Sequence, residues 1–254
     1  MTPKTRDEPF FIGFSNTVPA PLVLFLAVVA AAFIGGMAGL ALALSSSVDD
    51  PGDGFVAWGQ YQELSGILET EPYPILRLPA QNGQGPRAYL LSGQGKNGVQ
   101  SRATPLSGQP AEAGGVFIQR GSIQMLQVGG RVGLRAPEAD PAAFQPEDRV
   151  PLGRWRLTGE ICDGKCYLGI MRPGRGLSHK ACANLCIAGG VPPVFVAAGP
   201  VDGQEFFVVA GPDGGPMPDE WMRHVAVFIE AEGEIERMDD LYVFRIDPST
   251  IRPL

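Results

Sequence analysis

The chain opens with one long apolar run and then changes to short alternating patterns. Residues 21–44 are almost purely apolar, and no charged residue occurs from Pro9 to Val48. A helix of about 20 such residues crosses the roughly 30 Å hydrocarbon layer of a bilayer, so the run predicts a single transmembrane helix. A cleavable signal peptide is the alternative, with Ala41-Leu42-Ala43 as a small-x-small cleavage site. The apolar core of such a peptide normally spans only about 7–15 residues, which favours the transmembrane helix.

Flanking charge predicts the orientation of this helix. Lys4 and Arg6 precede the apolar run, whereas the next basic residue after it is Arg77. By the positive-inside rule the N-terminus stays cytoplasmic and the remainder of the chain is exported. We therefore expect a single-pass protein of the bacterial inner membrane whose C-terminal domain lies in the periplasm.

Small residues inside the apolar run indicate a partner in the membrane. Ala32, Gly35, Gly36 and Gly39 form overlapping small-x-x-x-small pairs, which allow close approach of a second helix. The expected partners are the lipid bilayer and an integral membrane protein complex.

The exported part has the texture of β-strands, with 34 Gly and 24 Pro in the chain favouring turns over long helices. Two stretches are similar: residues 62–67 followed by 115–124, and residues 156–161 followed by 225–236. Each begins with a strand that contains a central Gly and ends with a hairpin pattern. The predicted fold is mainly β, with one or two small barrels of the OB type, a five-stranded, partly open Greek-key barrel, after the membrane helix.

The expected organisation follows from these patterns and from two Pro/Gly-rich connecting segments. The units are a cytoplasmic or interfacial N-terminus (1–20), a transmembrane helix (21–45), a linker (46–60), a first small β unit (61–135), a second linker (136–152) and a second, OB-like β unit with the cysteines (153–254).

Charge and composition disfavour two classes of function. The net charge of −7 and the absence of a Lys/Arg cluster make nucleic acid an unexpected partner. The chain has two histidines, His179 and His224, and no Gly-x-Ser-x-Gly motif, so it shows no complete hydrolase signature. No catalytic residues are assigned, and a non-enzymatic role is favoured over an enzyme.

All four cysteines fall in one short segment that also contains a histidine. Their spacing is Cys162-x3-Cys166-x15-Cys182-x3-Cys186, with His179 between the two pairs. Ser178 is the expected N-cap of a helix that ends at the Gly189-Gly190 pair. In this helix the histidine and the last two cysteines lie at i, i+3 and i+7 on one face, so all five side chains are expected to converge.

Three interpretations of this cluster compete. Two disulfides are favoured, since clustered cysteines in an exported protein commonly staple a loop-rich segment. The second is a metal site formed by Cys162, Cys166, His179, Cys182 and Cys186, whose sulfur and imidazole donors suit zinc, copper or an Fe–S cluster. The third is a redox-active thiol pair, disfavoured because no Cys-x-x-Cys begins a helix. The identity of a cofactor stays open.

Residues 159–193 contain a motif that resembles one in uncharacterised bacterial membrane-anchored or exported proteins. In these proteins a strand, a Lys-Cys pair, His-x-x-Cys-x-x-x-Cys and Gly-Gly-x-Pro-Pro occur in small OB-like domains. The motif maps onto Cys166, His179, Cys182 and Cys186 and leaves Cys162 as an addition. The resemblance implies an envelope protein associated with electron-transfer machinery.

Two functions remain from the sequence. The leading hypothesis is a membrane-anchored periplasmic accessory subunit of a larger membrane complex, respiratory or otherwise engaged in electron transfer, with a disulfide-stapled β domain. The alternative is a membrane-tethered electron carrier or metallochaperone that binds a metal or an Fe–S cluster through the cysteine and histidine side chains.

Overall fold

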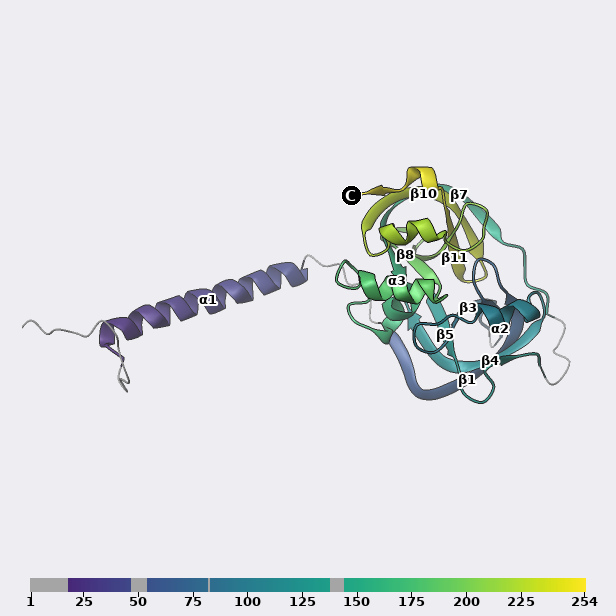
Figure 1. Ribbon diagram of the computed structural model, residues 1–254, viewed down its shortest axis with the longest axis horizontal. Helices are drawn as coiled ribbons and strands as arrows, with labels where there is room; N and C mark the ends of the chain where they lie inside the picture. Colours follow the sequence, from purple (N-terminus) through teal and green to yellow (C-terminus); the bar gives the residue numbers. More distant parts are fainter. Residues whose placement is uncertain (1–17, 47–53, 82, 138–143) are drawn as a thin grey trace, which may run out of the picture. The chain divides into compact units, whose positions relative to one another are not determined.

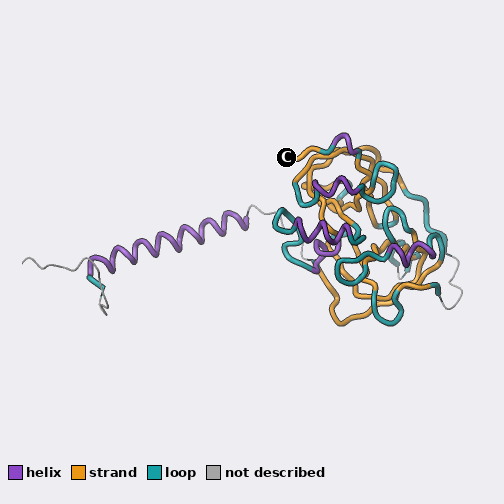
Figure 2. The backbone as a smooth tube through the Cα atoms, in the orientation of Figure 1, coloured by secondary structure: helices purple, strands orange, loops and turns teal. Residues whose placement is uncertain are grey.

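The computed structural model describes residues 18–46, 54–81, 83–137 and 144–254. It contains two compact units, the helix α1 (Ala20–Ser46) and a β-rich unit that extends to the C-terminus, in which helices are short (Figures 1 and 2). The basic residues Lys4 and Arg6 lie outside the described residues. So do residues 47–53 of the linker expected between the helix and the first β unit, and residues 138–143 of the second linker.

Helix α1 confirms the expectation of one N-terminal apolar helix. Within the described residues it is the one helix long and apolar enough to cross a membrane, over Ala20–Leu44. Apolar side chains surround it on all sides, as in a helix that contacts lipid. A signal sequence meets the same criteria, so the helix fixes neither the topology nor the orientation.

The first barrel follows the helix in the chain. Its strands close in the order β1-β2-β3-β5-β4, with β1 also paired to β4 and only β3–β5 parallel. Strand β1 begins at Phe55, inside the expected linker, because Phe55 already pairs with Gln119. The elements are β1 (Phe55–Glu69), β2 (Ile75–Leu78), β3 (Arg87–Ser92), α2 (Gln100–Ala103), η1 (Thr104–Leu106), β4 (Pro110–Arg120), β5 (Ile123–Val128) and β6 (Leu134–Arg135).

The second barrel repeats this topology. Its strands close in the order β7-β8-β9-β11-β10, with β7 paired to β10 and only β9–β11 parallel, so the expectation of OB-like barrels is confirmed and there are two of them. The elements are β7 (Val150–Asp163), η2 (Cys166–Ile170), α3 (Lys180–Ala188), β8 (Pro193–Val201), β9 (Gln204–Ala210), η3 (Asp219–His224), β10 (Phe228–Met238), β11 (Leu241–Ile246), η4 (Pro248–Thr250) and β12 (Arg252–Pro253).

Four glycines occupy matching places in the two barrels. Gly66 in β1 and Gly159 in β7 each lie against a carbonyl of the next strand, which a Cβ atom would approach to 2.1 Å. Gly115 in β4 and Gly233 in β10 do the same toward β5 and β11, at 2.1 and 2.2 Å. Such close approaches exclude any side chain, so the strand glycines of the two similar sequence stretches have one structural role: they let the backbones of adjacent strands approach closely.

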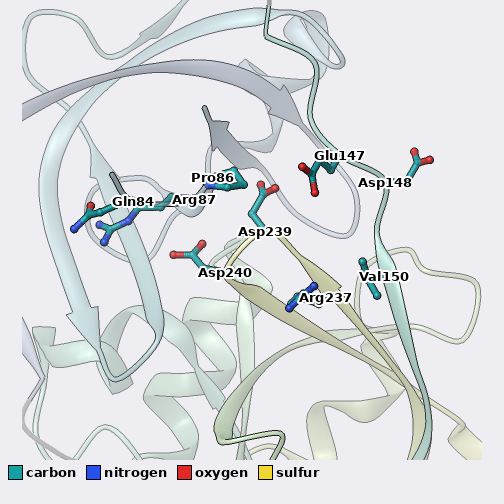
Figure 3. Close-up of a pocket in the computed structure, with 10 residues that line it drawn as sticks. Gln84, Pro86, Arg87, Glu147, Asp148, Val150, Arg237, Asp239 and Asp240 are labelled. Carbon is teal, nitrogen blue, oxygen red and sulfur yellow. The ribbon is translucent and has the colours of Figure 1, made fainter. Parts of the chain in front are cut away.

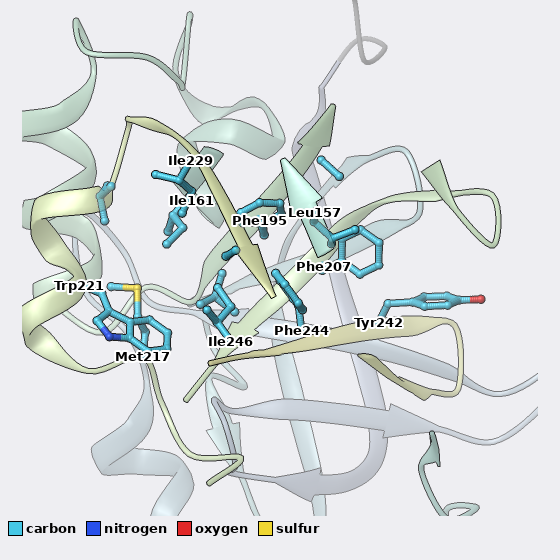
Figure 4. Packing of buried hydrophobic residues seen from close by; sticks show 14 of the residues in the cluster. Leu157, Ile161, Phe195, Phe207, Met217, Trp221, Ile229, Tyr242, Phe244 and Ile246 are labelled. Atoms are coloured by element: carbon cyan, nitrogen blue, oxygen red, sulfur yellow. The ribbon is translucent and has the colours of Figure 1, made fainter. Parts of the chain in front are cut away.

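The hydrophobic residues form three main clusters. One fills the first barrel, and a second fills the other barrel around Phe195, Phe207 and Phe244 (Figure 4). The third lies between the barrels. Strands β2, β3 and β5 therefore bury both faces, as do β8, β9 and β11, which explains their nearly continuous apolar sequences.

The contact between the barrels uses equivalent strands from each. Leu90 pairs with Met125 across β3 and β5, just as Val208 pairs with Val243 across β9 and β11, and all four side chains enter the shared cluster. The two halves thus meet through the same surface, as the subunits of an isologous dimer do.

A buried ion pair accompanies this apolar contact. Arg77 of β2 donates to Asp239, in the β10–β11 turn, at 2.7 Å, and the two side chains are 3% and 1% exposed. Glu69 accepts from the same guanidinium. The next residue, Asp240, accepts from the Ala88 amide at 2.8 Å. The tip of the second barrel's hairpin is therefore held in the first barrel by charge and hydrogen bonds.

An open pocket of about 560 Å³ lies beside this hairpin tip (Figure 3). Its wall includes Glu147, Asp148, Arg87 and Arg237, with Asp239 and Asp240 at its floor. Because the two floor carboxylates already have partners in the first barrel, the pocket is part of the contact between barrels.

Candidate metal centre

The cysteine segment lies in the connection between the first and second strands of the second barrel. Here residues 164–192 join β7 to β8, whereas residues 70–74 join the equivalent strands of the first barrel. In OB-folds this connection is one of the loops that bind ligands. The insertion is thus the main difference between the two repeats, and it carries all the clustered sulfur donors.

Two groups of donor atoms meet in this insertion. The ligand atoms of Cys166, His179 and Cys182 lie within 4.8 Å of one another, and so do those of Asp163, Cys166 and Cys186. Cys166 belongs to both groups, so the two form one continuous cluster. Bonds of about 2.0–2.3 Å around a tetrahedral ion place its ligand atoms roughly 3.3–3.8 Å apart, a separation that falls within this 4.8 Å limit.

The end of helix α3 holds Cys186 in place. The Val191 amide donates to the Cys186 carbonyl at 3.0 Å and the Gly190 amide donates to Ile187 at 2.8 Å, with Gly190 at a φ of +91°. This pattern is a Schellman motif, which ends a helix at a left-handed glycine. Val191 also packs against the Cys186 side chain. The Gly-Gly pair therefore positions the last cysteine as well as ending the helix, as the sequence predicts.

Asp163, the last residue of β7, joins the two halves of the cluster. Its Oδ2 lies 3.0 Å from His179 Nε2, and its Oδ1 accepts from the Cys166 amide at 2.8 Å. The carboxylate is fully buried and the imidazole is 4% exposed. A carboxylate that holds a histidine in this way fixes the orientation of the ring, an arrangement common behind metal-binding histidines.

A lysine from the first barrel reaches the cluster. Lys96 Nζ donates to Cys182 Sγ at 2.7 Å and to Cys186 Sγ at 3.7 Å. Its backbone approaches so closely that a Cβ on Gly189 would lie 1.9 Å from the Lys96 carbonyl. The Gly98 amide also donates to the Gly189 carbonyl at 2.7 Å. Glycine at the end of α3 thus lets the two barrels meet at the cluster.

A second lysine, Lys165, supports this contact from inside. Its side chain is 2% exposed, and its Nζ donates to the carbonyls of Gly93 and Gly95 at 2.7 and 2.8 Å. Burial lowers the pKa of Lys165. The lysine anchors the loop of the first barrel that presents Lys96.

The pKa values of the two buried thiols, Cys166 and Cys186, are shifted in opposite directions. A hydrogen bond from Cys166, together with the charge of Lys96, lowers the pKa of Cys186 to about 7 despite its burial. The same hydrogen bond, followed by burial, raises the pKa of Cys166. The lowered pKa favours the thiolate of Cys186, which is the form of cysteine that binds metals.

Met171 adds one more sulfur at the surface. Its Sδ lies 3.8 Å from Cys182 Sγ, and its backbone amide donates to the Cys166 carbonyl at 3.4 Å. The Met171 side chain is 45% exposed, whereas Cys182 is half-buried. Met171 was not singled out from the sequence.

Two details of the sequence prediction need correction. Cys162 does not join the cluster: it lies in the hydrophobic contact between the barrels, and its thiol faces Glu160 at 3.5 Å. Successive strand residues point to opposite faces, so Cys162 turns away from the side on which Asp163 meets the cluster. Helix α3 begins at Lys180 with His179 as its N-cap, one residue after the expected cap Ser178.

The disulfide interpretation is not supported. All four cysteines, each among the described residues, are free thiols. The separation of Cys162 removes one of the four partners that two bridges would need.

Comparison of the chain with known protein families, curated proteins and solved structures gives no match. The fold and the cluster are therefore the basis for a functional assignment.

Proposed function

We propose that this protein is a membrane-tethered binding protein for a thiophilic metal ion, held by Cys166, His179, Cys182 and Cys186. The observation that supports it best is that free thiols and an imidazole lie in two groups joined by Cys166. One group is Cys166, His179 and Cys182, the other is Asp163, Cys166 and Cys186, and the donor atoms within each lie within 4.8 Å of one another. Burial of Cys166, Cys186 and His179 removes competing water from most of the site. This is the alternative function from the sequence, with Cys162 removed from the ligand set.

The surroundings suit ligation. Because Asp163 engages Nε2 of His179, Nδ1 is the ring nitrogen left to bind the ion. The ammonium of Lys96 offsets part of the negative charge that several thiolates would bring together. Such a site stores, carries or delivers an ion, and with a redox-active metal it would carry an electron.

A matched pair of cysteine variants tests the proposal. The full-length protein, purified in detergent under reducing and anaerobic conditions, is titrated with Co²⁺ and followed by its visible absorption, with total metal determined separately. We expect Cys166→Ala to abolish stoichiometric binding and Cys162→Ala to preserve it, since Cys162 lies outside the cluster. Equal binding by the two variants, or no binding by the wild type, would contradict the proposal.

A second candidate keeps the leading hypothesis from the sequence: an accessory subunit of a larger electron-transfer complex in the membrane. The observation that favours it is the glycine surface of α1. Gly35, Gly36 and Gly39 have no neighbouring atom within 4 Å, which leaves their helix face open for another helix. Purification in mild detergent should recover a stoichiometric membrane partner, and Gly36→Leu should lose it. Recovery of a lone monomer would exclude this role.

The proposed location is the inner membrane of a bacterium, with the barrels in the periplasm. It is supported by the basic residues Lys4 and Arg6 before the apolar helix and by the lack of others up to Arg77. Protease added to spheroplasts should digest the barrels of the anchored protein. Protection of the barrels in intact spheroplasts would reverse the proposed orientation.

A further inference from the structure

The sulfur donors of the metal centre are graded in exposure. Met171 is 45% exposed, Cys182 is half-buried, and Cys166 and Cys186 are 4% and 2% exposed. With Met171 Sδ at 3.8 Å from Cys182 Sγ, the donors form a continuous path from the surface inward. An ion that arrives from solvent would meet the methionine and Cys182 before the buried ligands.

The chemistry of the outermost donor discriminates between metals. Protein ligands of zinc are thiolate, imidazole and carboxylate groups, whereas a neutral thioether together with thiolates selects monovalent copper. Methionine sulfur also fills gaps in hydrophobic cores, which would be a purely structural reason for the contact. A side chain that is nearly half exposed fills no such gap, so packing alone does not explain why Met171 lies against Cys182.

We propose that Met171 is the outer ligand through which the cysteine–histidine cluster receives its ion, and that this ion is Cu(I). The inference rests on the proposed function, since it names the ion for the same site. Met171 supplies the first soft donor at the surface, and Cys166, His179, Cys182 and Cys186 hold the ion once it is inside. A backbone hydrogen bond from the Met171 amide to the Cys166 carbonyl joins the segment of the outer donor to that of an inner one.

The test compares two methionine variants of the full-length protein, kept reduced under inert gas. Met171→Leu removes the thioether with little change in volume. Met222→Leu makes the same change at a half-buried methionine that packs against the core of the second barrel. Cu(I) and Zn²⁺ are the probes, and the affinity for each is measured separately by competition with a chromophoric chelator.

We expect Met171→Leu to weaken Cu(I) binding about tenfold or more, the loss typical of removing a group that supports a metal site, and to leave Zn²⁺ binding unchanged. Met222→Leu should alter neither affinity. Unchanged Cu(I) affinity in Met171→Leu, or an equal loss for both ions, would overturn the role of Met171. If the wild type binds Zn²⁺ and not Cu(I), the choice of ion fails while the metal-binding function stands. If it binds neither ion, the proposed function fails as well.

Discussion

The substitution Asp163→Asn tests whether the aspartate orients the metal-binding histidine. The carboxylate makes two contacts, with His179 Nε2 at 3.0 Å and with the Cys166 amide at 2.8 Å. An asparagine can still accept from the Cys166 amide, but its NH₂ group then faces His179. To accept a hydrogen bond from this NH₂ group, His179 Nε2 must be unprotonated. The imidazole proton then lies on Nδ1, the nitrogen proposed to bind the ion, and competes with the metal.

The expected loss of metal affinity follows from the loss of one hydrogen bond to a charged group. Such a bond contributes about 1.5–3 kcal/mol. This range corresponds to roughly a 10–100-fold fall in metal affinity, the usual effect of removing a carboxylate behind a metal-bound histidine. If the asparagine amide is rotated by half a turn, its oxygen accepts from His179 and its NH₂ group faces the Cys166 amide. In either orientation the asparagine keeps one of the two hydrogen bonds and loses the other.

The assay is a competition titration of wild-type and Asp163→Asn protein with a chromophoric chelator, with thermal unfolding followed by circular dichroism to check the fold. The control is Asp202→Asn, at an exposed turn residue with φ of 52°, a conformation that asparagine tolerates. A folded Asp163→Asn protein whose affinity stays within about twofold of wild type, or under 0.5 kcal/mol, would refute the role assigned to Asp163.

Three further predictions concern stability, measured by urea unfolding of the full-length protein. Asp239→Ala leaves the buried guanidinium of Arg77 with Glu69 as its remaining carboxylate, so it should lower the free energy of unfolding by about 3 kcal/mol, the lower end for a broken buried ion pair. Asp148 is an exposed residue that lines the same pocket as Asp239, and Asp148→Ala should change the free energy of unfolding little. Equal losses in the two variants would contradict a stabilising role for the Arg77–Asp239 ion pair. Burial raises the pKa of Glu69, but hydrogen bonds from arginines outweigh this and leave that pKa below its usual value. The stabilisation by ionised Glu69 should therefore be complete above its unfolded pKa of about 4.3 and be lost as the pH falls through its folded pKa. A free energy of unfolding that does not change with pH in this range would contradict this contribution of Glu69. Gly159→Ala should destabilise the second barrel strongly, because its Cβ would lie 2.1 Å from a carbonyl, and wild-type stability would show that the strands separate easily.

Several elements were predictable because their causes are local. The apolar run predicts α1 because a helix of about 20 consecutive apolar residues has the length and composition to cross the hydrocarbon layer of a bilayer. The strand glycines and the hairpin patterns revealed the repeat, since the same backbone approach recurs at Gly66 and Gly159. His179, Cys182 and Cys186 converge with Cys166 as helical spacing predicts.

Other parts of the site had no local signal. Lys96 reaches the cluster from the other barrel, so its position depends on how the two halves pack. Asp163 directly follows Cys162 and lies three residues before Cys166, and this position between two cysteines is the local signal that points to it. Met171 meets Cys182 because the chain turns back after η2, which the sequence pattern did not indicate.

The sequence by itself determined the apolar helix, the β-rich repeat and the donors that helix α3 carries, because periodicity and spacing act over a few residues. Only the tertiary structure decided which side chains complete the cluster. In the folded chain Cys162 points into the hydrophobic contact between the barrels, and Lys96 lies beside the thiol of Cys182. The physical reason is that strand direction and barrel packing assign each side chain to a face, and these depend on pairing between segments distant in the chain.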